Sequence, residues 1–469
     1  MEVRTPTSVD VHVVWPEHTG VEGLSMRAAH TTVDATSAGH ALAALRAWLP
    51  GLDSGRSPAS LAESARPDRF PYAEVLAHFH RVGRTHADPG LVSRLRYLND
   101  LLRQPELTAG RRLWPLPHWL PSTVDQRTGN YDSYLVAALL EGLTGMEDGG
   151  RPAADVEHAT DSKIDMLAAA LVADLALIET DALRAGPRTR EQRKRTQACL
   201  LVLSRLATLA PKWDRRPDMT GAGPGAAMTL VYPDQPGEAA QAERLVEVTG
   251  SLALKIRQRL PRSCRQVVNL SLLPTTRLHD EQMFVRCIQT FETMYRQVYR
   301  CLVRASAALQ VADAEGACAE LADATARIGI SSVLYRVVTT MPRASFAIIR
   351  QYTNGRSAIQ SRSYRRIDQV CAPRQPSPEA DKLPTVEVAS PTLQDTFFAI
   401  AGQLDPAVAD RLADQMRALD TAWRAMKRTH WGITLKIIGR VPGTGGTAGA
   451  EYLKHASEVP LFPLLAGAR

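Results

Sequence analysis

A periodic run of apolar side chains near the C-terminal end places the strongest constraint on the fold of this chain. Between Asp405 and Gly439, apolar residues recur at alternating steps of four and three, the spacing of one helix face. Asp405 followed by Pro406 is a typical helix start, and Gly439 followed by Pro442 is a typical end. We therefore expect a helix of about 33 residues, about 50 Å long. Its apolar stripe consists of Leu412, Met416, Leu419, Trp423, Met426, His430, Ile433 and Ile437.

The same periodicity recurs along most of the chain, whereas strand patterns are rare. Residues 1–125 are the exception, because "VDVHVVW" alternates like a short strand and the proline-broken "RLWPLPHWLPSTVD" is expected to be irregular. Residues 211–237 are expected to form a long loop or lid, and residues 371–391 a flexible connection. The sequence thus predicts an all-α protein with helices over residues 132–145, 162–185, 190–210, 238–259, 277–310, 313–341 and 405–438.

The composition is that of a large globular protein. Of the 469 residues, 45% are hydrophobic and 22% are charged. No apolar run reaches about 18 residues, the length that a membrane-spanning helix needs, and "MEVRTPTSVDVHVVWPEHTG" contains no apolar signal region. The six cysteines include no C-x-x-C pair, which is typical of a reducing compartment. We expect a cytoplasmic protein without a membrane partner.

The formal net charge of +7 raises the question of nucleic-acid binding. The densest basic run is "RTREQRKR", residues 188–195, at the start of an expected helix. A nucleic-acid site usually combines such a run with aromatic side chains that stack on bases, and no aromatic residue lies nearby. The run is interpreted as a solvated helix face, and no nucleic-acid partner is expected.

His430 lies on the apolar stripe, and the glycine-rich loop "GTGG" follows its helix. The histidine has two interpretations: a core residue hydrogen-bonded to a backbone carbonyl, or a neutral imidazole presented as the axial ligand of haem iron. The loop lacks the G-x-G-x-x-G and G-K-[ST] spacings of nucleotide sites and does not follow a strand. Its N–H groups and the Thr444 hydroxyl are suited to binding a small polar group.

The spacing around His430 resembles that of the tryptophan 2,3-dioxygenase and indoleamine 2,3-dioxygenase superfamily. In that family a helix-ending glycine lies nine residues after the haem-ligating histidine, and the threonine of a G-T-G-G-[ST] loop lies fourteen after it. Gly439 and Thr444 occupy these positions here. The resemblance implies that His430 is the metal ligand, that Thr444 and Gly445 bind the substrate, and that Thr444 occupies a catalytic position.

A second motif, "NYDSYLVAALL" at residues 130–140, resembles the family pattern Y-G-x-Y-L-x-L-D-x-L-L. The resemblance implies that Tyr131, Tyr134 and Leu135 bind the substrate. In the tetrameric tryptophan enzymes this segment reaches into the pocket of a neighbouring subunit. The family aspartate is replaced by Ala138.

A third motif, "HDEQMFVRCIQTFETMYRQV" at residues 279–298, is similar to H-D-E-x-L-F-x-x-x-H-Q-x-Y-E-L-W-x-K-Q. Phe284 matches an aromatic residue that packs on the indole ring and borders the haem. Ile288 stands where tryptophan dioxygenases carry a distal histidine, a catalytic position. Because the indoleamine branch also lacks that histidine, the change favours a modified indole or a different fate of the oxygen without excluding dioxygenation.

The fourth motif, "TTMPRASFAIIRQYTNGRSAIQSRSYRRID" at residues 339–368, resembles E-T-M-x-x-x-x-F-x-x-F-R-x-Y-L-x-x-A-S-G-F-Q-S-x-Q-[FY]-R-x-x-E. Arg365 matches the arginine that binds the substrate α-carboxylate through a bidentate fork. The resemblance also implies that Tyr364 binds substrate and that Ser357 contacts the haem.

The resemblance covers about residues 126–146 and 277–469. It implies a helical haem-binding bundle of the tryptophan dioxygenase type over residues 126–469, interrupted by a helical insertion at about residues 147–276. Residues 1–125 form an N-terminal extension of unknown role. Met426 stands where the family has a tryptophan, one turn after Trp423.

The implied activity is that of a haem-dependent oxygenase with haem b as cofactor and O₂ as co-substrate. It would add O₂ across the indole C2–C3 bond of L-tryptophan or a derivative and give an N-formylkynurenine-type product. One alternative is a monooxygenase or rearranging enzyme on an aromatic amino acid in specialised metabolite biosynthesis. The other is a haem- or indole-binding sensor without turnover. A homo-oligomer, a dimer or tetramer, is expected.

Overall fold

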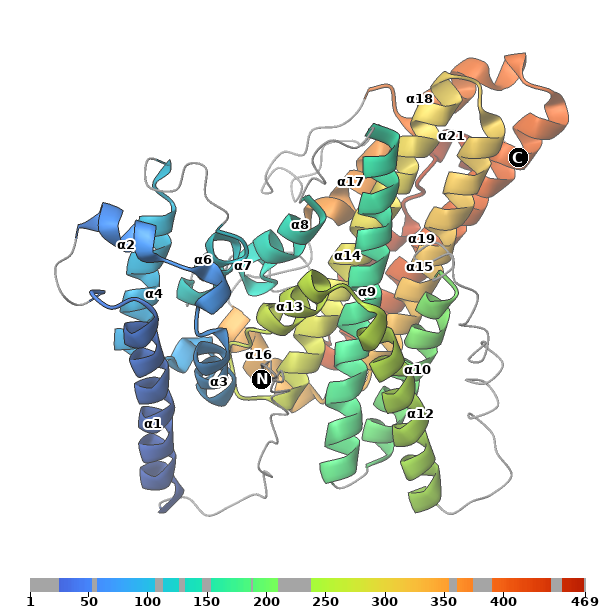
Figure 1. Ribbon diagram of the computed structural model, residues 1–469. Helices are drawn as coiled ribbons and strands as arrows, with labels where there is room; N and C mark the ends of the chain where they lie inside the picture. The colour runs from blue at the N-terminus through green and yellow to red at the C-terminus, as the bar shows by residue number, and fades with distance from the viewer. Residues whose placement is uncertain are drawn as a thin grey trace, which may run out of the picture.

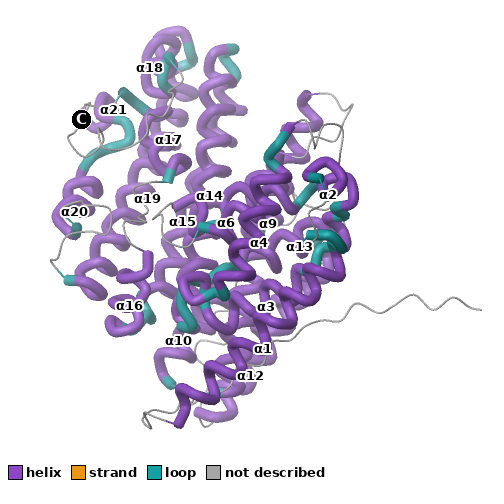
Figure 2. Tube along the Cα trace, turned by 90° about the vertical axis from the view of Figure 1, so that its left-hand side faces the viewer, coloured by secondary structure: helices purple, strands orange, loops and turns teal. Residues whose placement is uncertain are grey.

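All regular structure in the described part of the chain is helical, so the protein is all-α as predicted (Figures 1 and 2). None of the described helices has the length and apolar character that crossing a bilayer demands. The computed structural model describes residues 25–52, 57–105, 113–125, 131–145, 153–186, 189–209, 238–353, 361–373, 390–439 and 449–467.

Four long helices form the centre of the molecule. α14 (His279–Gln310) packs against α15 (Ala314–Val338) and α9 (Ala153–Ala185), and α15 packs against α19 (Pro406–Ile438) (Figure 1). α14 and α15 are neighbours in sequence, joined by a short turn in which Ala312 adopts a positive φ of 59°. α14 therefore contacts helices on both sides, which places its side chains at the centre of any site in this bundle.

α19 has the bounds and the buried face that its sequence predicts. The Asp405 side chain accepts a hydrogen bond from the Ala407 amide at 2.9 Å, Pro406 begins the helix, and Gly439 ends it with a φ of 72°. Every member of the predicted stripe except His430 is buried. His430 is half-buried, so it lies at the edge of the apolar face and not under it.

The remaining helices surround this centre, and several bear out the predicted ranges. The helix predicted over residues 238–259 is α12. The one predicted over residues 132–145 is broken into α7 and α8, because Val136 adopts a φ of 55° that no α-helix accommodates. The surrounding helices are α7 (Tyr131–Tyr134), α8 (Ala137–Gly145), α10 (Arg190–Ala207), α12 (Glu238–Arg259), α13 (Arg262–Ser271), α16 (Arg343–Thr353), α17 (Arg362–Cys371), α18 (Leu393–Ile400), α20 (Ala450–Glu458) and α21 (Pro463–Gly467).

The N-terminal region is helical where the structure describes it, and the irregular segment expected around residues 112–125 is largely a helix. Pro121 lies inside α6 and removes one hydrogen bond, while burial of Trp119 and Leu120 offsets that loss. The expected strand "VDVHVVW" and the expected loop at residues 211–237 lie outside the described residues. The N-terminal helices are α1 (Ser25–Trp48), α2 (Pro58–Ser64), α3 (Tyr72–Val82), α4 (Pro89–Leu102) and α6 (Leu116–Val124).

One member of the basic run is not part of a solvated face. Arg195 is buried, with Nη2 2.7 Å from the Asp280 carboxylate and Nε 2.8 Å from the Thr340 hydroxyl. It also lies 3.6 Å from Glu179, so two carboxylates compensate its charge. The interpretation as a solvated face is therefore wrong at this position. Periodicity does not reveal it because an arginine is rarely buried unless partners from distant segments surround it.

Candidate functional site

The second and third motifs meet in one apolar cluster between α7 and α14. Tyr131, Tyr134 and Leu135 are buried in it, and Phe284 and Ile288 of α14 pack against it. These two α14 residues are half-buried, whereas the residues around them on the helix are buried. Phe284 also contacts Phe346 of α16 edge-on, with ring centroids 5.8 Å apart. Five predicted site residues thus lie together.

Polar contacts fix the orientation of the α7 tyrosines. The Tyr131 hydroxyl donates to the Glu292 carboxylate at 2.9 Å, and the Tyr134 hydroxyl donates to Glu281 at 3.1 Å. The Gln289 amide donates to the Leu135 carbonyl at 3.0 Å. Each of these hydrogen bonds joins the second motif to the third, so the two motifs form a single structural unit.

Glu292 lies where α7, α14 and the start of α17 meet. Burial raises the pKa of its carboxyl to about 7, although hydrogen bonds from Ser361 and Tyr131 act in the opposite direction. Its proton occupancy therefore changes near neutral pH. Glu292 stands at the glutamate of the third family motif, and the resemblance implies no role for it.

α17 presents Arg365 beside α7. Its N-terminus is capped by Ser361, whose hydroxyl accepts from the Tyr364 amide at 3.1 Å. Arg365 is half-buried, and its Nε donates to the Ser361 carbonyl at 3.3 Å. Burial and the nearby Arg362 lower the pKa of the Arg365 guanidinium, which remains charged at neutral pH. Arg362 reaches Asp132 of α7 at 3.3 Å and joins the two helices.

Tyr364 faces α19. Its ring packs against Trp423 with centroids 4.9 Å apart, and the Lys427 ammonium lies 5.5 Å from its centroid. Trp423 and Lys427 both donate to the Asp368 carboxylate, at 3.0 and 3.1 Å. Tyr364 and Asp368 thus hold α17 against the histidine helix, a positioning contact for Arg365. The substrate-binding role of Tyr364 remains a prediction.

His430 stacks on Tyr335 of α15, with ring centroids 5.3 Å apart and an interplanar angle of 23°. Tyr335 in turn contacts Phe291 of α14 at 4.4 Å. Burial lowers the pKa of the His430 imidazole to about 4, so the ring is neutral. Phe291 follows Ile288 by less than one helical turn, so this stack borders the α14 face that carries the predicted site residues.

The surroundings of His430 fit a histidine that would hold a haem group. Between the described residues, no hydrogen bond or ion pair to the imidazole is found, so the backbone carbonyl partner of an ordinary core histidine is not seen there. A neutral, half-buried imidazole on an apolar wall is the form that ligates haem iron.

No cluster of three or more His, Cys, Asp or Glu side chains that could hold a metal ion occurs in the described parts. All six cysteines are free and buried.

Three predicted site residues, Ser357, Thr444 and Gly445, lie outside the described residues. Conversely, Tyr335 belongs to the site region and matches none of the four motifs. Its contact with His430 joins two helices far apart in sequence, and no local pattern encodes such a contact. An aromatic residue within a long helix is equally typical of an ordinary residue of the hydrophobic core.

Comparison with known proteins supports a distant relationship to one enzyme family. The chain is 27% identical to tryptophan 2,3-dioxygenase of Ruegeria sp. (strain TM1040), over 40% of this chain and 82% of that protein. It is 26% identical to the enzyme of Bradyrhizobium diazoefficiens, over 41% and 84%. For the Bordetella pertussis enzyme the values are 28%, 40% and 82%. No family model matches the chain. The chain is thus a distant relative of tryptophan 2,3-dioxygenases, with more of its length outside the match than inside.

Proposed function

We propose that this protein is a haem-dependent oxygenase that adds O₂ across the indole C2–C3 bond of L-tryptophan or a tryptophan derivative. The observation that carries the proposal is the meeting of separate motifs: the α7 tyrosines pack against Phe284 and Ile288, beside the stack that holds His430. Its distant relatives carry the name of this activity. The product would be of the N-formylkynurenine type.

His430 would hold haem b through its imidazole, with Phe284 and Ser357 as further residues that would contact the group. Bound haem would supply the activation of O₂, which becomes the source of both oxygen atoms in the product. The chain contributes a neutral imidazole, because a protonated ring could not donate a lone pair to iron. It also contributes the apolar side chains that keep water away from the reacting ring.

The remaining predicted residues would bind and orient the amino acid. The Arg365 guanidinium would bind the α-carboxylate by two parallel hydrogen bonds, and its anchor on Ser361 limits its rotation. Thr444 and the Gly445 amide, from the glycine-rich loop, would bind the amino-acid head. The rings of Phe284, Tyr131 and Tyr134 would enclose the indole. Orientation of this kind converts a two-molecule encounter into a reaction within one complex.

Ile288 would set the preference among indoles. Its side chain has no hydrogen-bonding group, and it lies half-buried against the α7 cluster. An indole N–H placed beside it would lose its water partner without gaining a protein partner, at a cost of about 1–3 kcal/mol. A substrate without that N–H, or with a substituted ring, avoids the cost.

We infer that the unmatched regions support this site. Residues 1–125 would be an N-terminal extension to a dioxygenase-like domain of residues 126–469, with an insertion at about residues 147–276. The proposal is supported by the packing of α9 from this insertion along α14, the helix that carries Phe284 and Ile288.

Product mass tests the proposed reaction against its two alternatives. The protein is loaded with haem, reduced, and supplied with substrate and O₂. Gain of two oxygen atoms supports dioxygenation, and gain of one indicates the monooxygenase. Binding of haem and indole with no product over many hours indicates the sensor.

A further inference from the structure

Arg84, in the N-terminal extension, is a buried charged residue that no motif includes. It is 0% exposed, and it lies just after α3. One guanidinium nitrogen, Nη1, donates to the Ser122 carbonyl at 2.8 Å and to the Ser133 carbonyl at 3.1 Å. The guanidinium also lies 5.8 Å from the centroid of the Tyr134 ring. The segment of residues 131–135, which carries Tyr131, Tyr134 and Leu135, is called the α7 wall below. Arg84 thus contacts this wall at the Ser133 backbone and at the Tyr134 side chain.

The segment around Arg84 is hydrogen-bonded to the loop that leads into α14. The Arg84 amide donates to the Pro274 carbonyl at 2.9 Å, and the Thr85 hydroxyl donates to the Thr275 carbonyl at 2.6 Å. Gly83 adopts a φ of 77° and lies so close to this loop that a Cβ would come within 2.5 Å of the Thr275 oxygen. The contact therefore depends on a glycine.

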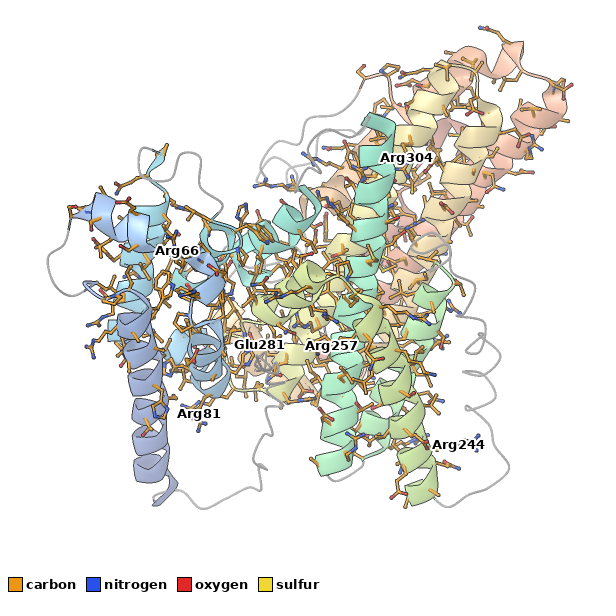
Figure 3. All side chains as sticks on the ribbon, viewed as in Figure 1. Arg66, Arg81, Arg244, Arg257, Glu281 and Arg304 are labelled. Carbon is orange, nitrogen blue, oxygen red and sulfur yellow. The ribbon has the colours of Figure 1, made fainter. Side chains whose placement is uncertain are left out.

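The same loop anchors the far end of the wall. Thr275 and Thr276 donate both backbone and hydroxyl hydrogen bonds to the Glu281 carboxylate, which also accepts from the Tyr134 hydroxyl at 3.1 Å. Glu281 lies where the N-terminal helices meet α14 (Figure 3). The Tyr134 ring is thus held by Arg84 at its face and by Glu281 at its hydroxyl.

We propose that Arg84 is a positioning residue that holds the α7 wall in the chain's own substrate site. The inference rests on the proposed function. The family resemblance implies that a neighbouring subunit supplies this wall. Here Tyr131, Tyr134 and Leu135 reach Phe284 and Ile288 within one chain. The N-terminal extension takes over the task of the neighbour, so that every chain carries a complete site whatever its oligomeric state.

The first test follows the wall itself and needs neither haem nor turnover. Amide hydrogen exchange is measured over residues 131–136 in wild type, Arg84→Met and Arg81→Met. Arg81 is the matched control because it is an exposed arginine in the last turn of α3, the helix that Arg84 follows (Figure 3). Arg84→Met should exchange faster on the order of tenfold, while Arg81→Met matches wild type. Equal exchange in all three proteins would overturn the inference.

The second test asks which chain supplies the wall and does not depend on an Arg84 variant that folds. A chain with Arg365→Ala is co-expressed with a chain carrying Tyr131→Ala and Tyr134→Ala, and the mixed preparation is assayed. If the wall came from a neighbour, a mixed oligomer would contain sites with an intact Arg365 and an intact wall, and activity would return. We expect no gain over the two variants assayed alone. Restored activity would overturn the inference.

Failure of the proposed function can be distinguished from failure of the proposed role of Arg84. If wild type binds neither haem nor tryptophan, the proposed function fails, while the exchange experiment still reports whether Arg84 holds the wall. If wild type is active and the exchange or the complementation result goes against Arg84, only the inference fails. In an active enzyme, Arg84→Met should also raise KM for tryptophan more than it lowers kcat, because the residue orients the wall without touching substrate.

Discussion

Single residues determine how the proposed site would recognise its substrate, and Arg365 is the first to test. Arg365→Lys keeps the charge but loses the planar fork. Losing one charge-assisted pair in a partly dry site costs on the order of 1.5–3 kcal/mol, so KM for the amino acid should rise about tenfold or more. Arg366→Lys is the matched control, since Arg366 is the exposed neighbour on the same helix. An unchanged KM in Arg365→Lys would mean that the carboxylate binds elsewhere.

Ile288 is tested by substrate preference. Wild type should bind 1-methyltryptophan or ring-substituted tryptophans at least as tightly as L-tryptophan. Ile288→His adds a hydrogen-bonding group and should shift preference toward L-tryptophan by about tenfold, the equivalent of one recovered hydrogen bond. Ile288→Leu controls for repacking of the cluster. A wild type that strongly prefers L-tryptophan, together with an Ile288→His variant of the same preference, would show that the side chain lies outside the pocket.

At the scale of elements, the contact of α7 with α14 should make stability depend on pH through Glu292. Burial raises the pKa of this carboxyl to about 7 in the folded protein, whereas an exposed glutamate titrates near 4.5. The fold therefore favours the protonated form, and its stabilising effect is lost as pH rises through 7. Glu292→Gln cannot titrate and escapes this loss.

The measurement compares urea unfolding midpoints at pH 5 and pH 8. The stability of Glu292→Gln relative to wild type should increase from the lower to the higher pH. Glu458→Gln, which removes an exposed carboxylate on α20, controls for the change of net charge. A relative stability of Glu292→Gln that is the same at both values would contradict a raised pKa.

The junction between α3 and the loop before α14 depends on Gly83. Gly83→Ala places a methyl group within 2.5 Å of the Thr275 carbonyl oxygen and imposes a φ that alanine rarely adopts. Unfolding free energy should fall by about 1–3 kcal/mol, measured by urea titration. Gly329→Ala, inside α15 with no atom within 4 Å of the new Cβ, should be neutral or stabilising by about 0.5–1 kcal/mol. Equal effects of the two substitutions would rule out a tight junction.

The sequence predicts a helix well when its cap residues and apolar face lie within its own residues. It predicts a helix poorly when tertiary contacts determine the structure. α19 is predicted from end to end because its cap residues and apolar stripe lie within the helix itself. α6 is not, because Trp119 buries its ring and donates to the Leu270 carbonyl at 2.8 Å, a tertiary contact that outweighs Pro121. The break at Val136, a buried residue with a φ of 55°, has no signal in the apolar periodicity either.

The residues of the candidate site likewise divide into those that a sequence motif identifies and those that only tertiary contacts reveal. Motif comparison predicts that Tyr131, Tyr134 and Leu135 belong with Phe284 and Ile288, and they lie together. Tyr335 and Arg84 could not be found in this way. Each acquires its position from segments distant in sequence, and an aromatic residue or an arginine by itself has many structural explanations.

At the scale of the whole molecule, the segments outside the matched region are part of one packed structure. A single continuous group of buried apolar side chains runs from Ala41 in α1 to Leu465 in α21. α9 lies along α14, and the N-terminal helices bond to the loop before it. The described parts of residues 1–125 and 147–276 therefore belong to the same packed structure as the proposed site.

Haem binding by His430, beside a site for an aromatic amino acid, is the proposal on which the others depend. One measurement addresses it directly: optical titration of the anaerobically reduced protein with L-tryptophan and 1-methyltryptophan. Wild type and His430→Ala are compared, with His455→Ala on α20 as an exposed histidine control. We expect wild type and His455→Ala to show a haem spectrum that changes saturably with the amino acid. We expect His430→Ala to lose the haem or its histidine-ligated spectrum. A wild type without haem, or a His430→Ala variant with the wild-type spectrum and titration, would contradict it.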